Sequence, residues 1–167
     1  MSSSSTNGFA NVLHTIPPVY DEFSKVLILG SFPSVKSREE QFFYGHPQNR
    51  FWRVLAAVHD CPVPQTVDEK RSFLLEKRIA LWDVIASCRI SGSSDSSIKN
   101  VVPNDVGLIL AEAEIERIFV NGKTAQKYYK RFLQPVLGRD AVVLPSTSPA
   151  NAAWSFEKLV EAWCVVR

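Results

Sequence analysis

Four short apolar runs, each followed by a stretch with helical character, are the feature of this chain that most restricts its fold. The runs are VLILG, IALWDVI, RIFVNG and AVVL, and they start at positions 26, 79, 117 and 141. Apolar runs of this length are typical of strands buried on both faces, and strands that alternate with helices form parallel sheets. We therefore expect an α/β fold with three layers, α/β/α, in which a four-stranded parallel sheet lies between helices.

The segments between these runs show the spacing of amphipathic helices. Phe51, Trp52, Leu55 and Val58 fall on one side of a helix that starts near Asn49. The segment CRISGSSDSS is rich in Ser and Gly, which favours a loop long enough to be functional. Further helices are expected over 68–77, 106–113, 123–136 and 151–166.

The length and composition are those of one globular domain. The 167 residues are enough to bury a core, and hydrophobic residues make up 46% and charged residues 22% of the chain. We expect a flexible tail over 1–15, where Ser residues cluster, and a folded domain over 16–167. The chain has no run of about 20 apolar residues and no secretory leader, so we expect an intracellular protein, in the cytoplasm and nucleoid or in a nucleus.

The cysteines and histidines do not suggest a metal site. Cys61, Cys88 and Cys164 form no C-x-x-C pair and are too few for a four-thiolate iron–sulfur cluster. The three histidines lack the H-E-x-x-H spacing, so we expect no metal and no organic cofactor. A net charge of only +2 does not by itself indicate a nucleic-acid-binding protein, although it is compatible with a local basic groove.

The residues that follow the four strands are candidates for a ligand site, because ligands of open parallel sheets bind beyond the carboxyl ends of the strands. The four strand exits read GSFPS, DVIASC, NGKT and PSTSPAN, and all are polar, small or proline-containing. Ordinary loop chemistry accounts for each exit alone, but together they would line one crevice. NGKT is not a phosphate loop, because Arg117 stands where G-x-x-x-x-G-K-[ST] needs its first glycine.

Two of these exits could contact phosphate. Lys123 stands at a helix start, where it either meets a phosphate or is solvated. The last exit offers the hydroxyls of Ser146, Thr147 and Ser148 just before a helix, where hydroxyls commonly contact phosphates. Helix N-capping by Ser148 or Asn151 is the alternative interpretation.

The segment QFFYGHPQNRFW, at 41–52, is the least ordinary part of the sequence. Phe42, Phe43 and Tyr44 are not explained by the helical stripe, and they either stack on a nucleobase or clamp the sheet. Asn49 stands at the position of a helix N-cap, and on pattern alone capping is the favoured interpretation. Asp83 ends an apolar strand, where a carboxylate costs free energy unless it is paired, for example with a base edge or backbone amides.

As an ordered set, VLILGSFPS, YGHPQNRFW, LWDVIASC, FVNGKTA and LPSTSPANA resemble the motifs of the uracil-DNA glycosylase superfamily. Within it, the chain is most similar to the hypoxanthine-DNA glycosylase branch, also called DNA-deoxyinosine glycosylase. The similarity runs from about Ile16 to the C-terminus. The resemblance implies a uracil-DNA glycosylase-like fold with DNA bound across the strand exits.

Two positions depart from the uracil-excising relatives. The mismatch-specific uracil/thymine branch has G-I-N-P-G at the first exit, where Asn positions the attacking water, but this chain has Phe32 there. The His of the relatives' final motif is replaced by Leu144. In the hypoxanthine branch the important Asn lies in H-P-x-N-x-F-W, which maps to Asn49 and implies a catalytic role beside any capping role.

The resemblance implies an enzyme that flips a deaminated base, hypoxanthine first, out of double-stranded DNA and hydrolyses its N-glycosidic bond, leaving an abasic site. We expect a monomer in which Asn49 orients the water, the base stacks on Phe32 or Phe43, and Asp83 accepts a hydrogen bond from N1–H. Main-chain amides of the GSFPS loop would donate to O6. The other expected contacts are Ser31 and Tyr44 with the base, and Pro33, Ser34, Lys123, Ser146, Thr147, Ser148, Pro149 and Asn151 with DNA.

Three other functions fit the same sequence. A uracil or G:T/U mismatch-specific glycosylase would share the fold and the chemistry and differ only in its pocket. A DNA-lesion-binding protein without catalysis is permitted by Phe32 at the usual Asn position. A hydrolase of free nucleosides is the third, although an esterase version is disfavoured because the chain lacks G-x-S-x-G.

Overall fold

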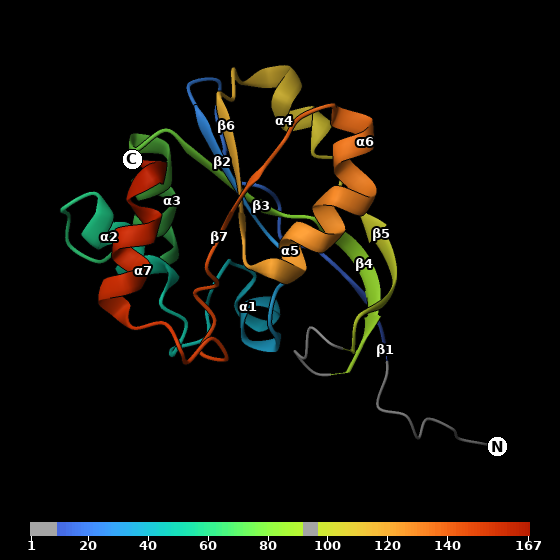
Figure 1. Ribbon diagram of the computed structural model, residues 1–167, viewed down its shortest axis with the longest axis horizontal. Coiled ribbons are helices and arrows are strands. Elements are labelled where there is room, and N and C mark those ends of the chain that lie inside the picture. The colour runs from blue at the N-terminus through green and yellow to red at the C-terminus, as the bar shows by residue number, and fades with distance from the viewer. Residues whose placement is uncertain (1–9, 92–96) are drawn as a thin grey trace.

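The computed structural model describes residues 10–91 and 97–167, and at its centre lies a four-stranded parallel sheet (Figure 1). The strands are β2 (Val26–Gly30), β3 (Ile79–Asp83), β6 (Arg117–Asn121) and β7 (Val142–Leu144), in the order β3-β2-β6-β7. The register pairs Gly30 with Asp83, and Asn121 with Leu144, so the strands end along one edge. This arrangement confirms the expected α/β class and parallel sheet.

Helices cover both faces of this sheet (Figure 1). One side carries α2 (Phe51–Val58), α3 (Val67–Glu76) and α7 (Phe156–Trp163), and the other carries α4 (Gly107–Glu112), α5 (Lys123–Tyr128) and α6 (Gln134–Leu137). A π-helical turn, Tyr129–Leu133, joins α5 to α6, and a 3-10 turn, Cys164–Val166, follows α7. The short helix α1 (Val35–Glu40) starts just beyond the end of β2, at the edge where the strands end.

The last helix is shorter than the sequence predicts. It was expected over 151–166, but it begins at Phe156, because Ser155 is extended and its side chain accepts a hydrogen bond from the Lys158 backbone amide. Since neither Ser148 nor Asn151 is the helix cap, residues 145–155 form a long loop beyond the exit of β7.

A second sheet, which the sequence did not predict, consists of β1 (Ala10–Leu13), β4 (Ile85–Ile90) and β5 (Lys99–Pro103), antiparallel in the order β1-β4-β5. The apolar run over 79–85, expected to form one strand, contains β3 and the first residue of β4, with Val84 between them. Residues 88–90 of the expected Ser/Gly-rich loop belong to β4, and 92–96 lie outside the described residues. The fold also extends upstream of the expected boundary at residue 16, to residue 10 at least.

The core is as apolar as the strand sequences predict. Every residue of β2 and of β3 is buried, and Leu27, Ile28 and Leu29 have no exposed surface. Trp163 of α7 is also fully buried, and its Nε1 donates to the carbonyl oxygen of Pro145 at 2.9 Å. This bond fastens the last helix to the exit of β7. In the part of the chain that the structure describes, no helix is both long and apolar enough to cross a bilayer.

Candidate functional site

The strand exits meet in one cavity of about 420 Å³ at the carboxyl edge of the parallel sheet. It is lined by residues from the exits of β2, β3, β6 and β7 and from the aromatic segment before α2. A cavity of this size can enclose a small organic ligand. The lining residues are Gly30, Ser31, Phe32, Pro33, Ser34, Ser37, Phe43, Tyr44, His46, Asn49, Asp83, Asn121, Ser146, Thr147, Ser148, Pro149 and Ala150.

Most of the candidate residues taken from the sequence lie in this cavity. Asn49 lines it, and so do all of the residues expected to contact a base: Ser31, Phe32, Phe43, Tyr44 and Asp83. Of the residues expected to contact DNA, Pro33, Ser34, Ser146, Thr147, Ser148 and Pro149 line it as well. Lys123 and Asn151 do not: Lys123 is exposed at the start of α5, and the Asn151 amide donates to the carbonyl oxygen of Ser146 at 3.0 Å.

Asn49 holds the start of α2 and lines the cavity. Arg50, not Asn49, is the N-cap residue, but Asn49 Oδ1 accepts a hydrogen bond from the Phe51 backbone amide at 2.9 Å. The same oxygen accepts from the Thr147 hydroxyl at 2.9 Å. Because a backbone N–H can only donate, the oxygen of the Asn49 amide must face Phe51, and both of its lone pairs are used. The amide nitrogen is the group that Asn49 can offer to a ligand.

Asn121 and Thr147 fix this orientation. Thr147 has no exposed surface, and its hydroxyl accepts from Asn121 Nδ2 at 3.0 Å while it donates to Asn49. Its backbone amide donates to Asn121 Oδ1 at 3.1 Å. The Thr147 hydroxyl is thus engaged within the protein and does not meet the expectation of a phosphate contact. Asn121 was missed in the sequence, although a polar residue at the end of a buried strand, like Asp83, was the available signal.

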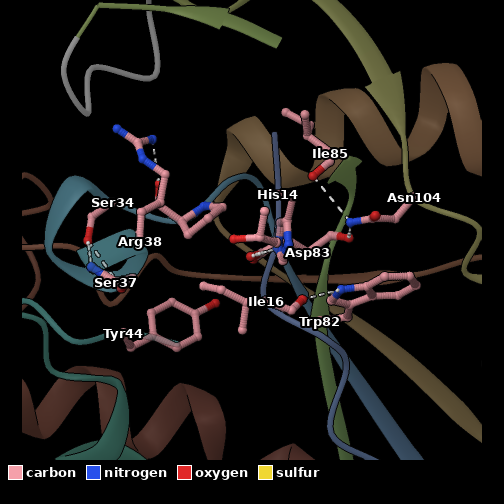
Figure 2. A network of polar contacts seen from close by, with 12 residues as sticks. His14, Ile16, Ser34, Ser37, Arg38, Tyr44, Trp82, Asp83, Ile85 and Asn104 are labelled. Atoms are coloured by element: carbon pink, nitrogen blue, oxygen red, sulfur yellow. Dashed lines mark hydrogen bonds and ion pairs between the residues drawn. The ribbon is translucent and has the colours of Figure 1, made fainter. Parts of the chain in front are cut away.

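Asp83 is the carboxylate at the wall of the cavity, and it is almost fully buried (Figure 2). Its Oδ2 lies 2.8 Å from His14 Nε2, and its backbone carbonyl accepts from the Asn104 amide at 2.9 Å. Its Oδ1 lies against Gly30, where an added β-carbon would approach within 3.0 Å. The cost of burying this carboxylate is therefore offset by a specific partner, which comes from a segment expected to be a tail.

The aromatic segment divides between core and cavity. Phe42 does not line the cavity and packs on Phe43 and Trp52, with ring centroids 5.5 and 6.1 Å away, so it clamps the core. Phe43 and Tyr44 line the cavity. Tyr44 has a positive φ of 54° and stacks on Phe51 with a centroid distance of 4.0 Å. A non-glycine residue in this backbone region is strained, and such strain is concentrated at functional sites.

Arg50 pins the loop over 145–155 to the start of α2. Its Nη2 donates to the carbonyl oxygens of Ser148 and Asn151, both at 3.1 Å, and its Nη1 donates to that of Trp154. Its backbone amide donates to the Thr147 carbonyl at 3.1 Å. One guanidinium thus gathers three carbonyls of the loop, for which its planar fork is well suited.

Replacing Arg50 with methionine should loosen this loop. The substitution keeps an unbranched apolar stem and removes the donors to three carbonyls, so the free energy of unfolding should fall by about 1–3 kcal/mol. Thermal denaturation and limited proteolysis of the loop would measure the effect. The same substitution at exposed Arg53 on α2 is the control and should change neither. Equal behaviour of the two variants would show that Arg50 does not hold the loop.

Metal-binding groups are not assembled here. Among residues 10–91 and 97–167, no cluster of three or more His, Cys, Asp or Glu side chains could hold a metal ion. The polar side chains that line the cavity are instead one carboxylate, one imidazole, amides and hydroxyls, of the kind that bind polar organic groups by hydrogen bonds.

Comparison with known proteins gives one consistent family. The family model described as uracil DNA glycosylase superfamily matches residues 17–167. A hypoxanthine DNA glycosylase of Methanosarcina acetivorans is 36% identical over 156 residues, which cover 90% of this chain and 96% of the relative. A hypoxanthine DNA glycosylase of Methanosarcina barkeri is 33% identical over 140 residues, covering 81% and 85%. A solution NMR structure of a candidate uracil DNA glycosylase from M. acetivorans matches with a TM-score of 0.75 and 32% identity, covering 90% of this chain and 96% of that one.

Proposed function

The chain belongs to the uracil DNA glycosylase superfamily, and we propose that it excises hypoxanthine from DNA as a monofunctional glycosylase. Its activity as a DNA glycosylase follows from that membership and from the two relatives, both named as hypoxanthine DNA glycosylases. The observation that carries the choice of base is Asp83, a buried carboxylate whose Oδ1 borders a cavity with aromatic walls.

Recognition of hypoxanthine rests on a hydrogen bond that adenine cannot make. Hypoxanthine has a hydrogen on N1, whereas N1 of adenine is a bare acceptor. Asp83 Oδ1 accepts from N1–H of the flipped base, and the amides of the loop at 30–34 donate to O6. The ring stacks against Phe32 or Phe43, while Ser31 and Tyr44 border its edges. A carboxylate facing the N1 lone pair of adenine would be repelled, so adenine is rejected.

Hydrolysis requires a water placed at C1′ of the deoxyribose. The bond between C1′ and N9 breaks with its electron pair going to the base, and the water oxygen bonds to C1′. The proton that the water loses is taken up by the departing base, which leaves as neutral hypoxanthine. The transition state resembles an oxocarbenium ion. Since Asn49 Oδ1 already accepts two hydrogen bonds, Asn49 holds this water by donation from Nδ2, and the water attacks with its other lone pair.

The product is an abasic site in an uncut strand. Cleavage of the strand by a glycosylase would need an amine to attack C1′, and none of the described residues that line the cavity is a lysine. This absence supports a monofunctional enzyme. We propose that the protein acts as a monomer on double-stranded DNA, in the nucleoid or nucleus.

The duplex is proposed to lie across the strand exits. Pro33 and Ser34 on one side and Ser146, Ser148 and Pro149 on the other border the mouth through which a flipped nucleotide would enter. Lys123 and Asn151 lie farther out and are proposed to contact the backbone phosphates. The base must leave the stack before it reaches Asp83, which costs least for a weak pair such as hypoxanthine with thymine.

A panel of duplexes tests the proposed substrate. Duplexes with hypoxanthine, uracil, xanthine or a G·T mismatch are incubated with the protein, and abasic sites are revealed by alkaline cleavage. We expect hypoxanthine to be released fastest. Faster release of uracil or of mismatched thymine would favour the mismatch-specific alternative. Tight binding without any abasic product would favour a lesion-binding protein, and release from free deoxyinosine alone would favour a nucleoside hydrolase.

Asp83→Asn should weaken the distinction between hypoxanthine and adenine. Removing the charge from the acceptor of N1–H should slow hypoxanthine excision by about 10- to 100-fold, since hydrogen bonds to charged groups contribute about 1.5–3 kcal/mol. Single-turnover rates on duplexes with either base measure this preference. Asp105→Asn, at an exposed position, is the control. An unchanged preference in Asp83→Asn would reject this mode of base reading.

A further inference from the structure

The imidazole of His14 is buried and lies beside the Asp83 carboxylate (Figure 2). His14 follows β1, and its side chain has no exposed surface. Its backbone amide donates to the carbonyl oxygen of Ala86 at 2.7 Å. Two residues on, the Ile16 carbonyl accepts from Trp82 Nε1 at 3.2 Å. The segment that carries His14 is therefore fastened to both β3 and β4, and the imidazole has a fixed position.

The hydrogen bonding of His14 is one-sided. Nε2 lies 2.8 Å from Asp83 Oδ2, whereas Nδ1 has no hydrogen-bond partner among the described residues. An acceptor cannot bond to an acceptor, so the hydrogen must be on Nε2 and point at the carboxylate. The hydrogen bond to Asp83 is thus the one that holds the imidazole ring among the described residues.

His14 also supports the aromatic walls of the cavity. Its ring lies edge-on to Phe32 at a centroid distance of 6.0 Å and tilted to Phe43 at 6.2 Å. Trp82 closes the third side at 6.3 Å. His14 itself does not line the cavity, yet it contacts three residues that do: Asp83, Phe32 and Phe43.

We propose that His14 is a positioning residue that makes Asp83 a single, fixed acceptor for the N1–H edge of the flipped base. The bond from Nε2 engages Oδ2 and fixes the plane of the carboxyl group, so that Oδ1 alone faces the cavity beside Gly30. Without it, the carboxyl group can rotate about its last bond, and its second oxygen is free. The distinction between purines with and without N1–H therefore depends on His14, although His14 touches no substrate.

This inference rests on the proposed function, and a double-mutant cycle with Asp83 tests it. The variants are His14→Phe, which keeps an aromatic ring without the donor, and His14→Gln, whose amide N–H can replace Nε2–H. Each is made alone and with Asp83→Asn. The probes are duplexes carrying hypoxanthine or unsubstituted purine opposite thymine, since purine lacks N1–H. The readout is the ratio of the two single-turnover rates, which loss of folded protein does not alter.

We expect His14→Phe to lower the hypoxanthine-to-purine ratio about 10-fold and His14→Gln to restore most of it. In the Asp83→Asn background, His14→Phe should leave the ratio unchanged, because its effect passes through Asp83. If His14→Phe does not fold, His14→Asn takes its place, since its shorter amide cannot reach Oδ2. His59→Phe is the control, because His59 lies outside the cavity, and it should leave the ratio unchanged. Burial lowers the pKa of the His59 imidazole, and the charges of Lys77 and Arg167 lower it further.

The outcomes separate this inference from the proposed function. If the wild-type protein releases no hypoxanthine, the proposed function fails. If it does, and His14→Phe or His14→Asn slows both substrates equally, the role of His14 is only structural and the inference is overturned. The inference would also be overturned if the double variant lowered the hypoxanthine-to-purine ratio by the product of the two single-variant effects. That result would show that His14 and Asp83 act independently.

Discussion

Asn49→Ala should reduce hypoxanthine excision by at least about 100-fold while the protein still binds the duplex, the scale seen when one preorganised donor is removed from an active site. The substitution removes the amide nitrogen that faces the cavity and the oxygen that accepts from Phe51 and Thr147. The reaction loses the group proposed to hold the water, and α2 loses a bond at its first turn. Single-turnover cleavage of an inosine duplex, with duplex binding measured alongside, checks both expectations.

Asn49→Asp separates the two roles of this side chain. It keeps an oxygen for Phe51 and Thr147 and replaces the amide nitrogen with a second oxygen. We expect it to fold like the wild-type protein and to lose most of the activity, as Asn49→Ala does. Near-normal cleavage by Asn49→Ala would remove Asn49 from the mechanism. Activity retained only by Asn49→Asp would show that the reaction needs an acceptor at this position.

Gly30→Ala should have the second largest effect, because the position has no room for a methyl group. A β-carbon there would lie under 3.0 Å from both Asp83 Oδ1 and the Tyr44 hydroxyl. Neither neighbour can retreat easily, since Asp83 is bound to His14 and Tyr44 is stacked on Phe51. We expect a stability loss of about 1–3 kcal/mol from overpacking and about a 100-fold fall in the rate of hypoxanthine excision from displacement of Asp83.

Gly107→Ala is the matched control for this substitution. Gly107 also has an unstrained φ, but a β-carbon there would meet Asp105 Oδ1 at 3.3 Å and Leu137 at 3.7 Å, outside the cavity. It opens α4, where alanine favours the helix. The activity of Gly107→Ala should match the wild type. Full activity in Gly30→Ala, at equal protein stability, would mean that Asp83 Oδ1 and Tyr44 are not held at the cavity wall as proposed.

The sequence was most informative where one physical effect dominates. Apolar runs such as 26–30 are typical of buried strands, and the topology of a parallel sheet then brings Asp83 and the other strand exits to one edge. For this reason the sequence alone could group many of the residues that lie in one cavity, although it gives no contacts between them. The start of α7 was less predictable. Ser148, Asn151 and Ser155 are all residue types that favour the N-cap position, and the sequence does not show which of them caps the helix.

The rest of the site depends on contacts between distant segments, which leave no local pattern. His14 precedes the first recognisable strand, and nothing near it in the sequence points to Asp83, 69 positions away. β1 has only four residues and pairs with β4, which is distant in the sequence, so no local pattern separates it from the tail before it. Thr147 looked like a phosphate ligand because hydroxyls before a helix often are, and only the fold shows that it is buried between Asn49 and Asn121.

The hydrogen bond from Thr147 to Asn49 spans 98 positions of the chain, and this has a consequence for synthesis on the ribosome. Asn49 emerges long before the hydroxyl that orients its amide and before the tryptophan of α7 that anchors the loop over 145–155. A nascent chain can bury much of β2 and β3 before then, yet it has no complete cavity. The site is therefore assembled only after both Thr147 and Trp163 have been synthesised.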